Sequence, residues 1–345
     1  MRYSVILVSF LLFLIACTNL DDKPDISNIE VDLRTDRFDK DFFSADTTRL
    51  STEMQRLEAK YPQLLPVFIQ SIIGVENEQG IYDFYRQYKP VYDSAQIIYS
   101  DLSAVEADIE KALKYVKYYF PEYELPKKII PVVGPMNSMN DLARMGNGEL
   151  TPNFIGPDFI GISLQFYLGR DFSWYNDEYF ITNVVPRFRS RRFSREYIVA
   201  DVMKLIADDI FPDKSNTRPL VEQMIERGKH WWLIDRFLPD TPDTIKTGYT
   251  RRQLDWVREN EGLIWSHIIK TENLYDLTPA TVQVYIGEAP FTQGLSQEDS
   301  PGNIGPWFGL QIIKKYLEKN PGISIADLMK KPAREILEEA KYKPK

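Results

Sequence analysis

The sequence is poor in the residues that build disulfides and zinc sites. Its 345 residues include one Cys, Cys17, and two His, His230 and His267. A single Cys excludes an intramolecular disulfide and every Cys-rich zinc module. The two His form no HExxH or HxH pair, which argues against a His-based catalytic metal site, and no G-x-S-x-G surrounds any Ser. We therefore expect neither a metal nor another cofactor.

An excess of positive charge is also missing. Lys and Arg total 42 against 50 Asp and Glu, so the formal net charge is -8. Proteins that bind nucleic acid through its phosphates carry basic surfaces, so this balance argues against a nucleic-acid partner. The densest basic cluster, residues 187–195, is short and supports at most a local contact with an anion. With 43% hydrophobic and 27% charged residues, the composition is typical of a folded globular protein.

Only one long hydrophobic run is present, and it lies close to the N-terminus. Residues 5–16 are apolar apart from Ser9 and end in Leu-Ile-Ala before Cys17. The run is shorter than the roughly 20 residues of a membrane-spanning helix, which favours a secretory signal. Leu-Ile-Ala-Cys matches the bacterial lipobox, so we predict that residues 1–16 are a signal peptide and that Cys17 carries acyl chains such as palmitate. A plain signal peptide followed by a chance Cys is the alternative.

The remaining sequence divides into a short tether and one domain. Residues 17–28 are predicted to be a flexible tether because the stretch after Cys17 is polar and lacks periodicity. Residues 29–33 alternate apolar and polar side chains, which predicts a half-buried strand where the domain begins. Neither an internal repeat nor a later linker is apparent, so residues 29–345 are predicted to form a single globular domain.

Strand patterns come early and helix patterns dominate the second half, which indicates the α+β class. Buried strands are predicted over 129–133 and within 151–169, where apolar residues are bounded by Gly and Pro. Thr250 and Gln253 have the spacing of a capping box, and Ser324 has that of an N-cap. Apolar residues at helical spacing predict helices over 47–60, 67–73, 81–88, 102–120, 198–206, 220–238 and 251–273.

Several groups of side chains have both a functional and a structural interpretation. Trp231, Trp232, Trp256 and Trp265 could line a sugar or peptide groove, but their helical spacing favours packing in the core. The pairs Asp208–Asp209 and Glu298–Asp299 could serve calcium or acid–base chemistry, but they are more typical of a helix end and a solvated loop. The Gly- and Pro-rich stretches 285–291 and 300–309 can form a site or merely tight turns.

Two stretches near the C-terminal end are distinctive, Glu-Ala-Pro-Phe-Thr at 288–292 and Ser-Pro-Gly-Asn-Ile-Gly-Pro-Trp-Phe-Gly at the start of 300–316. They are the most specific part of a resemblance to a known family, the gliding-motility lipoprotein GldB family. The resemblance includes the lipobox and implies a cell-envelope lipoprotein that is required for gliding and associated with the motility and type IX secretion machinery. The other matching stretches are 159–162, 167–171, 197–202, 237–243, 248–250, Trp256 and 342–344.

The GldB family is also distantly similar to predicted zinc peptidases that carry HExxH on a helix. The counterpart here is residues 195–199, which keep Glu196 but have neither His. Without two imidazoles a zinc ion has no ligand set, so the resemblance implies a degenerate zincin-like fold without catalysis. On position alone, the candidate relic groove comprises Glu196, Glu288, Pro301, Gly302, Gly305, Trp307 and Gly309.

These observations predict a non-catalytic lipoprotein that binds other gliding-machinery or envelope proteins. Thr18 follows Cys17 where Asp would retain a lipoprotein in the inner membrane, which favours the outer membrane and leaves its face open. One alternative is an envelope hydrolase with an atypical metal or carboxylate site, which requires Glu196 and Glu288 to converge in one cleft. The other is a surface glycan-binding lipoprotein, which requires an exposed Trp among those at 231, 232 and 265.

Overall fold

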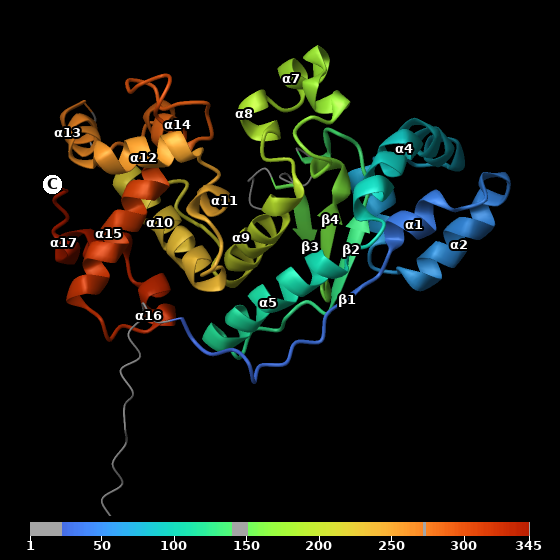
Figure 1. Cartoon of the computed structure of the whole chain (residues 1–345), viewed down its shortest axis with the longest axis horizontal. Coiled ribbons are helices and arrows are strands. Elements are labelled where there is room, and N and C mark those ends of the chain that lie inside the picture. Colours follow the sequence, from blue (N-terminus) through green and yellow to red (C-terminus); the bar gives the residue numbers. More distant parts are fainter. Residues whose placement is uncertain (1–22, 140–150, 272–273, 345) are drawn as a thin grey trace, which may run out of the picture.

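The computed structural model describes residues 23–139, 151–271 and 274–344 (Figure 1). The predicted signal peptide, Cys17 and the first part of the tether lie outside the described residues. A four-stranded sheet stands between the N-terminal helices on one side and the C-terminal helices on the other (Figure 1). The fold is therefore α+β, as the sequence predicted, and the strands all precede residue 164.

The sheet has the strand order β1-β2-β4-β3. Its strands are β1 (Arg34–Thr35), β2 (Lys128–Val132), β3 (Asn153–Ile155) and β4 (Phe159–Ser163). β1, β2 and β4 run parallel, and β3 pairs antiparallel with β4 at the edge of the sheet. All of β4 is buried, which is why its sequence is a continuous rather than an alternating apolar run.

The predicted strand over residues 29–33 is wrong. Those residues form no strand, and pairing begins only where Arg34 aligns with Lys128. The alternation of apolar and polar residues indicates burial instead, because Leu33 is buried and Val31 packs against the core. Periodicity marks the buried side chains, but a strand also needs a neighbour to pair with, and β2 begins at Lys128.

The helices between β1 and β2 follow the predicted ranges, except for α1, which was not predicted, and for one helix that burial lengthens. They are α1 (Phe38–Phe43), α2 (Leu50–Lys60), α3 (Leu65–Val67), α4 (Glu78–Tyr99) and α5 (Ser103–Tyr119), with a π-helical turn at Phe68–Ile72. The expected helix over 81–88 continues past Pro90 to Tyr99. Val91, Ala95 and Tyr99 are buried along this extension, so packing outweighs the backbone hydrogen bond that Pro90 cannot donate.

The second half of the chain is almost entirely helical. Its longer helices are α9 (Ile198–Ile210), α10 (Leu220–Phe237), α12 (Arg251–Glu259), α13 (Glu261–Thr271) and α15 (Gly305–Lys319). The capping box of Thr250 and Gln253 is present, but the helix predicted over 251–273 breaks at Asn260 into α12 and α13. Shorter helices are α7 (Glu178–Asn183), α8 (Arg187–Ser190), α11 (Asp243–Thr247), α14 (Pro279–Ile286), α16 (Ile325–Lys330) and α17 (Ala333–Ala340).

Helices α10 and α15 touch through their backbones. A Cβ atom on Gly228 of α10 would lie 2.2 Å from the carbonyl carbon of Gly309, and one on Gly309 would lie 1.7 Å from the carbonyl oxygen of Met224. Both distances are far inside van der Waals contact, so only glycine permits this approach.

Among the described residues, no helix is long and apolar enough to cross a membrane.

Replacing Gly309 by Ala is expected to lower the free energy of unfolding by about 1–3 kcal/mol. The added methyl group forces α15 away from α10, which outweighs the roughly 1 kcal/mol by which Ala favours a helix over Gly. Gly322→Ala is the control, because a Cβ there meets nothing within 4 Å. Urea unfolding of the domain from residue 18 onward would measure both variants, and equal stability of the two would contradict the backbone contact.

Candidate functional site

Two adjacent cavities share a cluster of charged side chains. The first, which we call the β3 cleft, lies between β3 and α9 and has a volume of about 560 Å³. The second, the Trp231 cavity, lies among α9, α10 and α14 and measures about 520 Å³. The residues that line both are Arg189, Arg192, Lys204, Asp208 and Glu288. This shared cluster makes the two cavities one candidate site.

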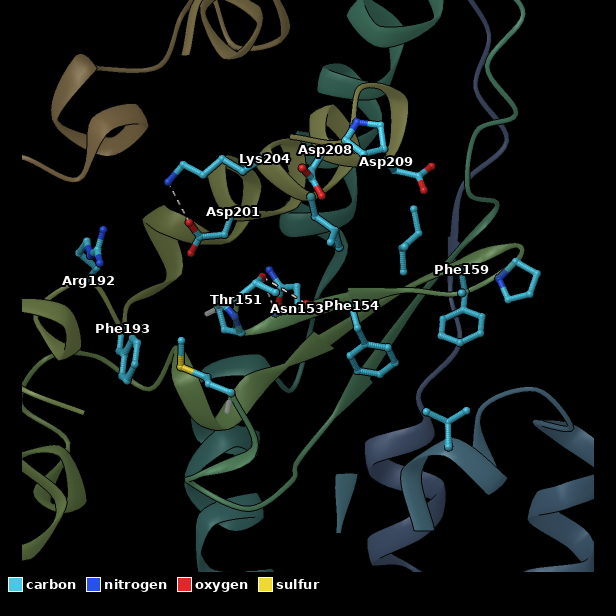
Figure 2. A pocket seen from close by; sticks show the side chains of 18 of the residues that line it. Thr151, Asn153, Phe154, Phe159, Arg192, Phe193, Asp201, Lys204, Asp208 and Asp209 are labelled. Carbon is cyan, nitrogen blue, oxygen red and sulfur yellow. Dashed lines mark hydrogen bonds and ion pairs between the residues drawn. The ribbon is translucent and has the colours of Figure 1, made fainter. Parts of the chain in front are cut away.

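The β3 cleft has an apolar wall and a charged wall, which lie on opposite sides of the edge strand in Figure 2. Phe154 of β3 and Phe159 at the start of β4 form the apolar wall, whereas Asp201, Lys204 and Asp208 come from α9. The helix presents these charges because Ile198, Val202 and Ile206, four residues apart, are its buried face. Such a combination suits a ligand that has both apolar and charged groups.

A chain of polar contacts runs from the charged wall to a fully buried amide. Lys204 lies 3.2 Å from Asp201, and the Tyr167 hydroxyl donates to Asp201 Oδ2 at 3.2 Å. Because the hydroxyl hydrogen points to the Asp201 carboxylate, the hydroxyl oxygen accepts a hydrogen bond from Asn153 Nδ2 at 2.8 Å. Burial, followed by the charge of Asp201, raises the pKa of Tyr167 well above its usual value, so the hydroxyl keeps its proton.

This chain fixes the orientation of the Asn153 amide. Asn153 lines the β3 cleft and has no exposed surface, and its Oδ1 accepts no hydrogen bond. A buried acceptor without a donor is costly unless a bound group supplies one. The oxygen has almost no accessible surface, so a ligand in the cleft would reach it only after a movement of the lining residues.

Glu288 is held between two arginines. Its carboxylate lies 2.6 Å from Arg189 Nε and 2.8 Å from Arg192 Nη2. Burial opposes ionisation of Glu288, but the charges of Arg192 and Arg189 outweigh it and hold its pKa below the usual range. The carboxylate is ionised at neutral pH, which suits it to accept hydrogen bonds and makes it a poor general acid.

Glu196 does not join Glu288 in either cavity. Glu196 lies on the short 3₁₀ helix Arg195–Tyr197 and is exposed. It lines neither the β3 cleft nor the Trp231 cavity. The convergence that the hydrolase hypothesis requires is therefore absent from these two cavities.

The residues near Glu196 also do not fit a zinc ion. Arg195 and Val199 occupy the positions of the two His in HExxH, and neither side chain is a zinc ligand. His230 places its ring nitrogens 3.1 Å and 2.7 Å from the carbonyl oxygens of Glu226 and Phe211, so backbone groups already occupy both. No group of three His, Cys, Asp or Glu suited to a metal ion occurs in the part of the chain that the structure describes.

The other candidate groove residues support the segment that carries Glu288. Pro301 and Gly302 are buried, and a Cβ on Gly302 would lie 2.0 Å from the carbonyl oxygen of Ala289. Thr292 donates to the Pro301 carbonyl at 2.6 Å, which closes the loop. Gly305, Trp307 and Gly309 are buried within α15 and line neither main cavity. Gly305 packs against the Tyr285 carbonyl, close to the Glu288 segment, whereas Gly309 packs against Met224 of α10.

Most of the tryptophans follow their structural interpretation, whereas Asp208 and Asp209 have structural contacts and also line the β3 cleft. Trp232 and Trp265 are buried, but Trp231 is half-buried and lines the cavity named after it. Of the three tryptophans that the glycan hypothesis invokes, only this one lines either main cavity. Asp208 accepts from the Asp213 amide at 3.2 Å and Asp209 from the Tyr123 hydroxyl at 2.6 Å, whereas Glu298 and Asp299 pair with Arg252.

Sequence reasoning missed Asn153, Asp201 and Lys204. A sequence pattern could have identified Asp201 and Lys204, because both lie on the polar face of a helix whose apolar face is evident from the sequence. No local pattern identifies Asn153, because its role depends on a contact with Tyr167, 14 positions further along the sequence.

The fold and site define an α+β protein in which a small sheet and a helical half enclose a mixed apolar and charged cleft. The chain belongs to the family described as gliding motility protein GldB, whose model matches residues 19–344. No curated protein and no solved structure matches it significantly. The similarity to zinc peptidases that the sequence suggested is not shown by these comparisons.

The Glu288 contacts predict an acid-sensitive contribution to stability. Because the folded-state pKa of Glu288 lies below its ordinary 4.5, the contribution is present above about pH 4.5 and is lost as the pH falls through the folded-state value. At pH 7, Glu288→Gln is expected to lower the free energy of unfolding by about 1–2 kcal/mol, given that the carboxylate is about one-third exposed. Urea unfolding at pH 7 and pH 3.5 would show the difference from wild type shrinking at the lower pH.

The matched control is Glu298→Gln, whose side chain is 82% exposed beside Arg252. It should change stability by no more than about 0.5 kcal/mol at either pH. A difference between wild type and Glu288→Gln that stays constant with pH would contradict the assignment.

Proposed function

We propose that this protein is a cell-envelope lipoprotein that supports gliding by binding another protein of the motility or type IX secretion machinery, and that it catalyses no reaction. Family membership over residues 19–344 supports the link to gliding. The observation that carries the binding role is the β3 cleft, with its apolar wall and its charged wall.

The lipid on Cys17 is the proposed attachment to the membrane. The residues before it have the length and composition of a signal, and no spanning helix occurs among the described residues that could replace a lipid anchor. Acyl chains each contribute about 0.8 kcal/mol per buried CH₂ group, so a multiply acylated N-terminus holds a protein on a bilayer durably. Thr18 favours the outer membrane as the destination.

Replacing Cys17 by Ser is expected to abolish lipidation and to release the protein from membranes. The variant should fail to incorporate labelled palmitate and should fractionate with soluble envelope proteins, and cells that carry it should lose gliding. A Thr18→Ser variant keeps the lipobox intact and serves as the control. Membrane association and labelling that persist without the Cys17 sulfur would refute the anchor.

The non-catalytic role rests on the state of the two candidate glutamates. Glu288 is ionised and neutralised by Arg189 and Arg192, whereas Glu196 lies outside both cavities. Hydrolysis by a carboxylate pair needs one group that keeps a proton and one that has lost it, both within reach of a single substrate. Binding a partner requires no such pair of carboxyl groups.

Variants in the cleft and at Glu196 separate binding from catalysis. Leu205 on α9 lines the cleft and is half-exposed, so Leu205→Glu places a charge on the binding surface without emptying the core. We expect it to abolish colony spreading at a normal protein level, whereas Glu196→Gln should spread normally. Ile97→Glu, at an 83% exposed helical position of α4, is the matched control and should also spread.

Immunoblots of each strain would establish that the variants accumulate equally. Loss of spreading in Glu196→Gln at a normal protein level would overturn the non-catalytic role. Normal spreading of Leu205→Glu would overturn the binding role of the cleft.

A further inference from the structure

The N-terminal segment is fastened to the body at a point close to the lipidation site in the sequence. Lys23 places its ammonium 2.8 Å from both carboxylate oxygens of Asp240, in the turn after α10. Lys111 of α5 approaches the same carboxylate at 2.9 Å. The hydrogen bonds from Lys23 and Lys111 lower the pKa of Asp240 to about 2, so the carboxylate stays ionised at neutral and mildly acidic pH.

Covalent geometry then limits how far this point can lie from the membrane. Lys23 is six residues after Cys17, and six residues span at most about 22 Å when fully extended. Without the Asp240 contact, the first buried residue would be Leu33, sixteen residues after Cys17, and the limit would rise to about 58 Å. Since a domain of this size is about 50 Å across, only the shorter tether restricts which face meets the bilayer.

We propose that the Lys23–Asp240–Lys111 contact holds the face formed by α5 and the turn after α10 next to the phospholipid surface, so that α7 and α8 face away from the membrane. The proposal rests on the proposed function, because it requires the lipid on Cys17. Figure 1 shows the described N-terminal segment passing beneath α5 on its way to β1, with α7 and α8 on the opposite side of the molecule.

This orientation bears on access to the site. Arg189 of α8 lines both cavities, and α8 lies on the side turned away from the bilayer. A partner protein then reaches the charged cluster from the aqueous compartment and not through the headgroups. Exposed ion pairs are screened by salt, so the orientation should loosen at high ionic strength.

Energy transfer from single labels to labelled lipid tests the orientation. The full lipoprotein is purified and reconstituted into phosphatidylethanolamine and phosphatidylglycerol vesicles that contain a headgroup-labelled acceptor lipid. Because acylation consumes the thiol of the only Cys, an introduced Cys takes the donor dye alone. Asp108→Cys lies one turn before Lys111 on α5, and Tyr179→Cys lies at a 71% exposed position of α7.

We expect transfer from position 108 to exceed that from position 179, and the ratio of the two to fall toward one in Asp240→Ala and in 1 M salt. Asp93→Ala, which removes an exposed carboxylate that pairs with Lys89 on α4, should leave the ratio unchanged. Equal transfer from both positions, or a ratio unaffected by Asp240→Ala, would overturn the orientation.

Vesicle flotation distinguishes this failure from failure of the proposed function. Protein that does not float with the vesicles lacks the lipid, which overturns both proposals together. Protein that floats but transfers equally from both labels keeps its anchor and loses only the orientation.

Discussion

The backbone contact between α10 and α15 sets the geometry on which the candidate site depends. Gly228 and Gly309 bring the two helix axes as close as their carbonyl groups permit. That approach fixes where α15 begins, and hence where the loop of residues 287–304 must end. The loop is then pinned by the Tyr249 hydroxyl, which donates to the Asn303 carbonyl at 2.7 Å. Asn303 has a φ of 53°, a conformation in which Asn is tolerated better than most residues. These contacts hold the loop in the conformation that places Glu288 beside Arg189 and Arg192.

The charged cluster joins the sheet half of the molecule to the helical half. Arg189 and Arg192 follow the sheet in the chain, whereas Glu288 arrives from the C-terminal side, about 100 residues later. In a protein with a net charge of -8, two arginines near the surface would be free to attract anions. Here the Glu288 carboxylate pairs with both arginines, and this charged cluster lies where the β3 cleft adjoins the Trp231 cavity. The same pairing keeps Glu288 ionised, which supports the proposed non-catalytic role.

Features that depend on neighbouring residues could be predicted from the sequence. α5, α9, the capping box at Thr250 and the buried strands around Ile130 and Ile160 all arise from local periodicity or capping. The strand expected over residues 29–33 failed because its partner, β2, lies about 95 residues further along the chain. α4 extends beyond its predicted end because buried contacts after Pro90 outweigh the tendency of proline to end a helix. The site followed the same division. Glu288 was singled out by its unusual segment and the arginines by the basic cluster 187–195, but their pairing across about 100 positions was not predicted.

The unsatisfied oxygen of Asn153 has a different cause from the errors of the strand and helix predictions. The Asn153 amide nitrogen donates to Tyr167, whose hydroxyl is committed to Asp201, and the amide oxygen has no donor among the described residues. An apolar residue of similar size would carry no unpaired oxygen, so stability alone does not account for an amide there. Packing accounts for Gly228 and Gly309, and charge balance accounts for Glu288. Neither accounts for Asn153, and this is the physical reason why the proposed binding role centres on the β3 cleft.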